Sequence, residues 1–164
     1  MNSKLFFLVA ISLIGTAFIA SAQDYSEDGQ EYFIKYLDKK SQIDLISKSL
    51  PSVEDCKLVF KGNSAYTYYG FIADMKAELN SIDESNDLFV DCRIETFTTC
   101  DILQGKGNYA GGMSSIVDEL QPTVVFYAVT YLREKDAEYG STYKYFVNIR
   151  GNWVFFPKPY LISK

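Results

Sequence analysis

"STYKYFVNIRGNWVFF", residues 141–156, has the pattern of two β-strands joined by a tight turn. Apolar and polar positions alternate at the two-residue period of a strand. One face of the first strand is predicted to hold Tyr143, Tyr145, Val147 and Ile149. Gly151 and Asn152 supply the positive φ that a short hairpin turn needs. Because aromatic residues pack well on a pleated sheet, the segment predicts a hairpin in the protein core. A ligand clamp built from the same aromatic residues is the alternative.

Two further strands are predicted upstream of this hairpin. Residues 123–134, "TVVFYAVTYLRE", are apolar on both faces, which indicates a central strand covered on both sides. Residues 87–99, "DLFVDCRIETFTT", alternate between apolar and polar positions, as in a half-buried strand. The side predicted to face the core holds Leu88, Val90, Cys92 and Ile94, and the other side holds Phe89, Asp91, Arg93 and Glu95.

Helices are predicted in the first half of the chain. Residues 31–40 carry apolar side chains at helical spacing, and residues 43–50 continue that helix or form a second one before Pro51. Ser52, followed three positions later by Asp55, is typical of a helix start.

A longer amphipathic helix is predicted over residues 65–82, with Tyr69, Ile72, Met75 and Leu79 on one stripe. A Gly-rich loop, residues 105–112, then leads into a short helix over residues 113–120. The chain therefore has helices first, then a strand, a short helix and a three-stranded antiparallel meander. This order predicts an α+β fold. The N-terminal helices are expected on one face of a curved, mainly antiparallel sheet of about four strands that ends in the C-terminal meander.

The order of elements from about Glu31 to Phe156 resembles the nuclear transport factor 2-like cone folds, and cystatin-like arrangements of a helix on a curved sheet are similar as well. The resemblance implies an apolar pocket between sheet and helices. Such folds use this pocket for ligand binding, occasionally for catalysis, and they often dimerise. A fold does not define a function, so the residues of a site must do so.

The N-terminus has the features of a secretory signal peptide over residues 1–22. Lys4 precedes a mostly apolar stretch that ends in the cleavage signal Ala20-Ser21-Ala22. An uncleaved membrane anchor is the alternative. We predict a secreted or periplasmic protein, with residues 23–30 as a flexible mature N-terminus and residues 31–164 as a single α+β domain. No apolar run after the leader approaches a membrane span, so no membrane partner is expected after cleavage.

The composition narrows the chemistry. The formal net charge is −5 and there is no basic cluster, so nucleic acid is not an expected partner. The sequence has no His, which removes Ser-His-Asp and Cys-His catalysis and the commonest metal ligand. The loop over residues 105–112 has the letters of a dinucleotide-binding motif but lacks the surrounding βαβ unit. No metal or cofactor is therefore expected, and an enzyme would have to use Asp, Glu, Tyr or Lys.

The three cysteines, Cys56, Cys92 and Cys100, are candidates for a disulfide because an exported protein meets an oxidising environment. An odd number leaves at least one thiol unpaired within the chain. A Cys92–Cys100 bridge would require the chain to turn back near Thr98, and Cys56 is a plausible partner for either. Buried, unpaired cysteines that act as small apolar residues are the alternative.

Candidate ligand-binding residues are Tyr127, Tyr145 and Trp153 on the aromatic sheet, and Asp91 with Arg93 on the charged strand face. A solvated face is the alternative for the charged pair. We expect a non-catalytic module that binds a small apolar ligand or a protein partner. A small isomerase or hydrolase using Tyr, Asp or Glu in an apolar pocket is one alternative, and a structural module that forms a homodimer is another. A buried carboxylate with a raised pKa would favour the enzyme, an apolar pocket the binding module, and an exposed apolar sheet face the dimer.

Overall fold

The computed structural model describes residues 25–79 and 87–163, so the predicted signal peptide lies outside the described residues. The helices are α1 (Ser26–Phe33), α2 (Lys39–Lys48), α3 (Val53–Val59), α4 (Ser64–Leu79) and α5 (Thr99–Leu103), with the 3₁₀ helices η1 (Gly111–Glu119) and η2 (Pro159–Ser163). The strands are β1 (Asp91–Thr98), β2 (Val125–Leu132), β3 (Ser141–Ile149) and β4 (Asn152–Phe155). In the described part of the chain, no helix combines the length and the apolar character that crossing a membrane requires.

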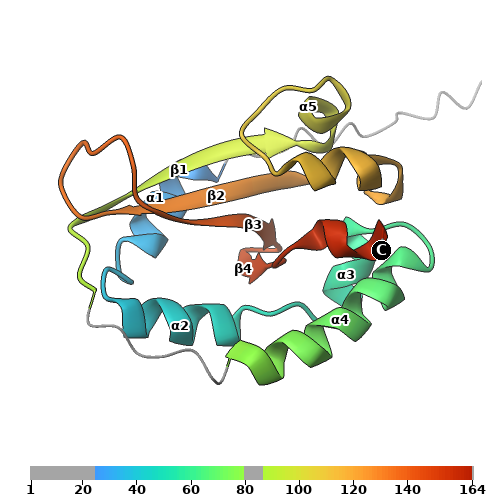
Figure 1. Ribbon diagram of the computed structural model, residues 1–164, viewed down its shortest axis with the longest axis horizontal. Coiled ribbons are helices and arrows are strands. Elements are labelled where there is room, and N and C mark those ends of the chain that lie inside the picture. The colour runs from blue at the N-terminus through green and yellow to red at the C-terminus, as the bar shows by residue number, and fades with distance from the viewer. Residues whose placement is uncertain (1–24, 80–86, 164) are drawn as a thin grey trace, which may run out of the picture.

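The strands form one antiparallel sheet in the order β1-β2-β3-β4, so the predicted α+β fold with a four-stranded antiparallel sheet is confirmed (Figure 1). The predicted hairpin is the β3–β4 pair, in which Ile149 lies opposite Asn152. The two turn residues are Arg150 and Gly151, with φ of 54° and 84°. Positive φ at both positions is the geometry of a type I′ turn. The positive φ therefore falls on Arg150 and Gly151, one residue earlier than predicted.

Two hydrophobic clusters lie on opposite faces of the sheet. The first contains Phe33 of α1 and Leu45 of α2 packed on Tyr127 and Trp153. The second contains residues of α3, α4 and η1 packed on the other face, where Phe126 points. Because Phe126 and Tyr127 are neighbours in β2, alternation sends them to opposite sides. The expectation that residues 123–134 are covered on both faces is confirmed. The expectation that the helices pack on one face of the sheet is wrong, because helices cover both faces.

A β-bulge in β3 changes the face on which its aromatic residues lie. The register of β2 against β3 runs from Tyr127–Phe146 to Val129–Tyr143, so β3 has one extra residue between the two pairs. Tyr145 has a φ of 75° at this point. A bulge of this kind shifts the alternation by one position. Tyr143 therefore packs on the first cluster and Tyr145 on the second, and the prediction that both share one face is wrong.

Helix α1 begins at Ser26, five residues before the predicted helix start at Glu31. Residues 26–30, assigned from the sequence to a flexible terminus, belong to this helix. Gly29 lies so close to the sheet that an added Cβ would stand 2.8 Å from Ile94 Cδ1 and 3.0 Å from Trp153 Cζ2. Because Gly29 has no side chain, the polar segment of residues 26–30 packs closely on β1 and β4. The polar composition of this segment does not predict such packing.

Two further details differ from the sequence-based expectation. In α4 the buried aromatic residue is Tyr68, whose hydroxyl donates to the Pro157 carbonyl at 2.8 Å, whereas Tyr69 is exposed. Before β1, Phe89 is buried and its neighbours Leu88 and Val90 are exposed, the reverse of the predicted alternation. Strand pairing of β1 begins only at Asp91, so the alternation does not extend back to these residues.

All three cysteines are free thiols in the structure. Cys56 belongs to the cluster on one face of the sheet and Cys92 to the cluster on the other, so the sheet separates them. Burial raises the pKa of the Cys56 thiol to about 12 and that of Cys92 to about 11. Cys100 lies exposed on α5. The arrangement is that of the alternative in which buried cysteines serve as small apolar residues.

Candidate functional site

The predicted ligand residues fall into three separate places in the fold. Trp153 and Tyr127 lie together, with ring centroids 4.9 Å apart and planes at 89°. Tyr145 lies on the opposite face of the sheet. Asp91 and Arg93 lie on β1, at the edge of the sheet farthest from β4. A single site cannot use all five residues, so each group is considered by itself.

Tyr145 serves the packing of the second cluster. Its hydroxyl accepts a hydrogen bond from the Ala110 N–H at 3.0 Å, and its ring stands edge-on to Phe97 and Phe126. Burial raises the pKa of Tyr145, so the hydroxyl stays protonated. These contacts fix the end of the Gly-rich loop to the sheet and leave Tyr145 outside the candidate site.

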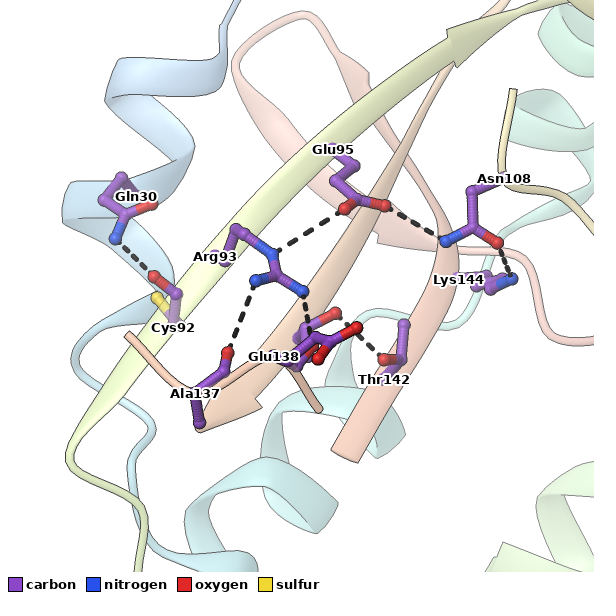
Figure 2. Close-up of polar contacts among 10 residues, drawn as sticks. Gln30, Cys92, Arg93, Glu95, Asn108, Ala137, Glu138, Thr142 and Lys144 are labelled. Carbon is purple, nitrogen blue, oxygen red and sulfur yellow. Dashed lines mark hydrogen bonds and ion pairs between the residues drawn. The ribbon is translucent and has the colours of Figure 1, made fainter. Parts of the chain in front are cut away.

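Arg93 lies on a solvent-exposed face of β1 (Figure 2). Its guanidinium donates to the carbonyls of Ala137 and Glu138, at 3.4 and 3.2 Å, and pairs with Glu95 at 3.6 Å. The side chains of Arg93 and Glu95 are 43% and 42% exposed. An ion pair this exposed contributes at most about 1 kcal/mol to stability.

The same network extends from Glu95 to β3 (Figure 2). Asn108 donates to the Glu95 carboxylate at 3.2 Å and accepts from Lys144 at 2.9 Å. Asp91 accepts a hydrogen bond from the Cys92 N–H at 2.8 Å. These bonds attach the surrounding loops to the sheet, and neither cavity described below is lined by Asp91, Arg93 or Glu95. The exposure of Arg93 and Glu95 favours the solvated-face alternative for the charged pair.

The strands β2 and β3 diverge at one end. Their last paired residues are Tyr127 and Phe146. Beyond this point Val125 pairs with Thr98 of β1, and Asn148 pairs with Trp153 of β4. The sheet is therefore split between β2 and β3 over its last residues.

A pocket of about 350 Å³, which we call the strand cleft, lies at this split. The residues that line it are Tyr25, Leu58, Val59, Thr123, Val124, Val125, Tyr127, Val147, Asn148, Ile149 and Arg150. Most of these side chains are aliphatic, and the single charged one is Arg150. The predicted residue Tyr127 is part of the lining, and Trp153 stands directly behind it.

The backbone of Asn148 faces the strand cleft. Phe155 of β4 donates its N–H to the Ser49 carbonyl at 2.7 Å, so this group points away from β3. Hydrogen-bonding direction alternates along a strand. Phe146–Phe155 is therefore a pair without hydrogen bonds between β3 and β4. The Asn148–Trp153 pair lies two residues further along the ladder, so it is a pair of the same kind. The N–H and C=O of Asn148 consequently point toward β2, where no β2 residue is registered opposite them.

Arg150 lies at the tip of the hairpin and is exposed. Within residues 25–79 and 87–163, its guanidinium has neither a hydrogen-bond nor an ion-pair partner. It also lines a second groove, of about 610 Å³, on the other side of the hairpin. The cation thus stands at the hairpin turn between two concave surfaces and is available to a ligand.

The second groove runs between α2 and β4. Its charged lining residues are Asp44, Lys48, Asp55 and Arg150, two acids and two bases. Tyr32 forms part of its wall, and burial, followed by the hydrogen bond with Tyr36, raises the pKa of Tyr32 to about 12. Tyr32 is therefore a neutral hydrogen-bonding group at physiological pH and not a base.

The carboxyl groups with a shifted pKa lie away from both cavities. Hydrogen bonds from Ser41 lower the pKa of Asp38, and hydrogen bonds from Thr98 lower that of Asp101. Both are helix-start contacts, and neither residue lines the strand cleft. In the part of the chain that the structure describes, no group of three or more Cys, Asp or Glu residues could hold a metal ion.

Comparisons of the chain with models of known protein families, with curated proteins and with solved structures found no match.

Proposed function

We propose that this protein is an exported, non-catalytic binding module whose ligand lies in the strand cleft. The observation that carries the proposal is the cleft itself, an apolar concavity of about 350 Å³ into which a few polar groups point. Ligand sites for small molecules are of this kind, mostly apolar with a small number of orienting polar groups, and they begin at about 300 Å³. The ligand class is a small apolar molecule.

Burial of apolar surface provides the binding free energy. Val59, Val124, Val147 and Ile149 form the buried wall, and Leu58, which is 45% exposed, stands at the mouth. A ligand that buries about 200 Å² of apolar surface gains roughly 5 kcal/mol before the entropy of association is subtracted. Such a ligand binds weakly to moderately, as expected for a small molecule in an open cleft.

The enzymatic alternative receives less support from the site. Acid–base catalysis needs a titratable group whose pKa lies near the working pH. The described residues that line the strand cleft include no carboxylate, and the titratable groups among them are two tyrosines and one arginine. These groups suit binding and orientation better than proton transfer.

The dimerisation alternative predicted an exposed apolar sheet face. In the structure both faces of the sheet carry buried clusters under helices, and the exposed part on β1 bears the ion pair of Arg93 and Glu95. A charged surface of this kind opposes pairing of sheets. The geometry therefore supports the binding module over a sheet-mediated homodimer.

Tryptophan fluorescence tests the proposal, because Trp153 is the single tryptophan of the chain and contacts Tyr127 of the cleft wall. The protein is titrated with two eight-carbon probes, 1-octanol and octanoate. We expect saturable binding of at least one probe, and its loss in Val125→Phe, which fills the cleft. The matched control is Val90→Phe, since Val90 is 57% exposed and lies outside the cleft. Undiminished binding by a folded Val125→Phe variant would place the ligand elsewhere.

A further inference from the structure

The lining of the strand cleft also specifies the charge of its ligand, an inference that rests on the proposed function. We propose that the cleft binds an apolar monocarboxylate, a molecule with a hydrocarbon or aromatic body and one carboxylate. The Arg150 guanidinium and the Asn148 backbone N–H hold the carboxylate, and the aliphatic wall holds the body.

The residues that line the strand cleft carry a positive charge. Arg150 is the single charged residue among those that line the cleft, and no described residue pairs with its guanidinium. An arginine presents a planar set of N–H donors that matches the geometry of a carboxylate. The second groove, by contrast, is lined by two acids and two bases and therefore has no preference for one sign of charge.

The backbone of β3 supplies a second donor. Asn148 lies near the end of β3, and Arg150 follows two residues later in the hairpin turn; both line the cleft. The Asn148 N–H points toward β2, into the split where no β2 residue is registered opposite it. A carboxylate has two oxygens, so one accepts from the guanidinium and the other from the N–H. Hydrogen bonds to a charged acceptor are about twice as strong as neutral ones.

The aliphatic wall selects the body of the ligand. Val59, Val124, Val147 and Ile149 are between 1% and 9% exposed, so the wall is a continuous part of the protein core. Each added CH₂ group that is buried here increases affinity about fourfold, until the cleft of about 350 Å³ is full. A series of saturated carboxylates of increasing length should therefore gain affinity and then reach a plateau.

The experiment compares octanoate with 1-octanol, which share the hydrocarbon body but differ in charge. Fluorescence titration measures both affinities in the wild-type protein and in Arg150→Gln, Arg150→Lys and Arg133→Gln. Arg133→Gln is the matched control, because Arg133 is 68% exposed, pairs with Asp87 at 2.8 Å and lies outside the cleft. Thermal unfolding of each variant confirms that it is folded.

We expect the wild-type protein to bind octanoate about tenfold or more tightly than 1-octanol, the preference given by a charge-assisted hydrogen bond. Arg150→Gln should abolish this preference without changing the affinity for 1-octanol, Arg150→Lys should keep part of it, and Arg133→Gln should keep all of it. High salt should weaken the binding of octanoate and not that of 1-octanol.

Two results would overturn the inference, and they are distinguishable. Equal affinities for the two probes, or equal losses for both in Arg150→Gln, would contradict the carboxylate inference and leave the proposed binding function standing. Failure of both probes and of the longer carboxylates to bind at millimolar concentration would contradict the proposed function as well.

Discussion

Replacing Trp153 with alanine should destabilise the protein strongly, because this side chain joins the hairpin to α1. Its ring centroid lies 5.0 Å from that of Phe33 and 4.9 Å from that of Tyr127, and only 8% of the residue is exposed. Gly29 of α1 lies directly against the indole. Removing a large buried aromatic side chain leaves a cavity that the neighbours fill only in part.

The expected loss is about 3–5 kcal/mol in the free energy of unfolding. A domain of this size has a total stability of roughly 5–15 kcal/mol, so the expected loss is a substantial fraction of it. The midpoint of thermal unfolding should fall by about 10 °C or more. Far-ultraviolet circular dichroism in a urea series measures the change, since the variant has no tryptophan to report by fluorescence.

Trp153→Phe is the control, because it keeps an aromatic ring against Phe33 and Tyr127. This substitution should lose less than half as much stability as the alanine variant. The opposite pattern would refute the reasoning. A Trp153→Ala variant that loses less than about 1 kcal/mol but no longer binds either eight-carbon probe in isothermal titration calorimetry, which needs no tryptophan, would show that the indole is a ligand clamp and not a core residue.

Two further predictions concern a buried tyrosine, Tyr131, and a half-buried one, Tyr32. Tyr131 is 1% exposed and its hydroxyl has no hydrogen-bond partner among the described residues. Tyr131→Phe should therefore raise the free energy of unfolding by about 1 kcal/mol, measured in the same urea series. A loss of stability would instead indicate a bound water or other partner at that hydroxyl. Burial raises the pKa of Tyr32 to about 12, so the unfolded chain releases this proton near its ordinary value of 10 while the folded chain retains it. The contribution of Tyr32 to stability should therefore be constant below pH 10 and be lost between pH 10 and 12, so stability should fall more steeply there than in Tyr32→Phe, and an equal slope in both proteins would contradict the assignment.

The fold could be predicted from the sequence because its signals are local. Gly151 marks the hairpin turn, Ser52 and Asp55 form the predicted capping box at the start of α3, and the apolar residues of 123–134 indicate a strand buried on both faces. The pattern of residues 87–99 predicts no helix α5, although Thr98 and Asp101 form a capping box of the same kind at its start. That signal overlaps the end of a strand pattern, which conceals the start of the helix.

The candidate site could not be predicted in the same way, because it depends on where the pairing of two strands stops. The bulge at Tyr145 shifts the alternation of β3. The residue types of that segment do not predict a bulge, since tyrosine rarely adopts a positive φ. Of the three aromatic residues that the sequence groups together, Tyr127 and Trp153 lie side by side, whereas Tyr145 lies on the opposite face of the sheet. In the sequence Asn148 and Arg150 are ordinary polar residues near a turn, and the divergence of β2 from β3 brings their donors to a cleft.

The split sheet has a mechanical consequence. The pairs β1–β2 and β3–β4 are two ribbons that are joined by β2–β3 pairing between Tyr127–Phe146 and Tyr131–Ser141 and stand apart beyond it. Beyond Tyr127–Phe146 no registered backbone pair joins the two ribbons, so their separation at the open end is set by side-chain packing, such as that of Val124 and Val147, and not by ladder hydrogen bonds. Arg150 and Asn148 both belong to the β3–β4 hairpin, so the spacing of their two donors is set within one ribbon. A substitution in the packed wall should therefore change the width of the cleft and leave the two donors in place.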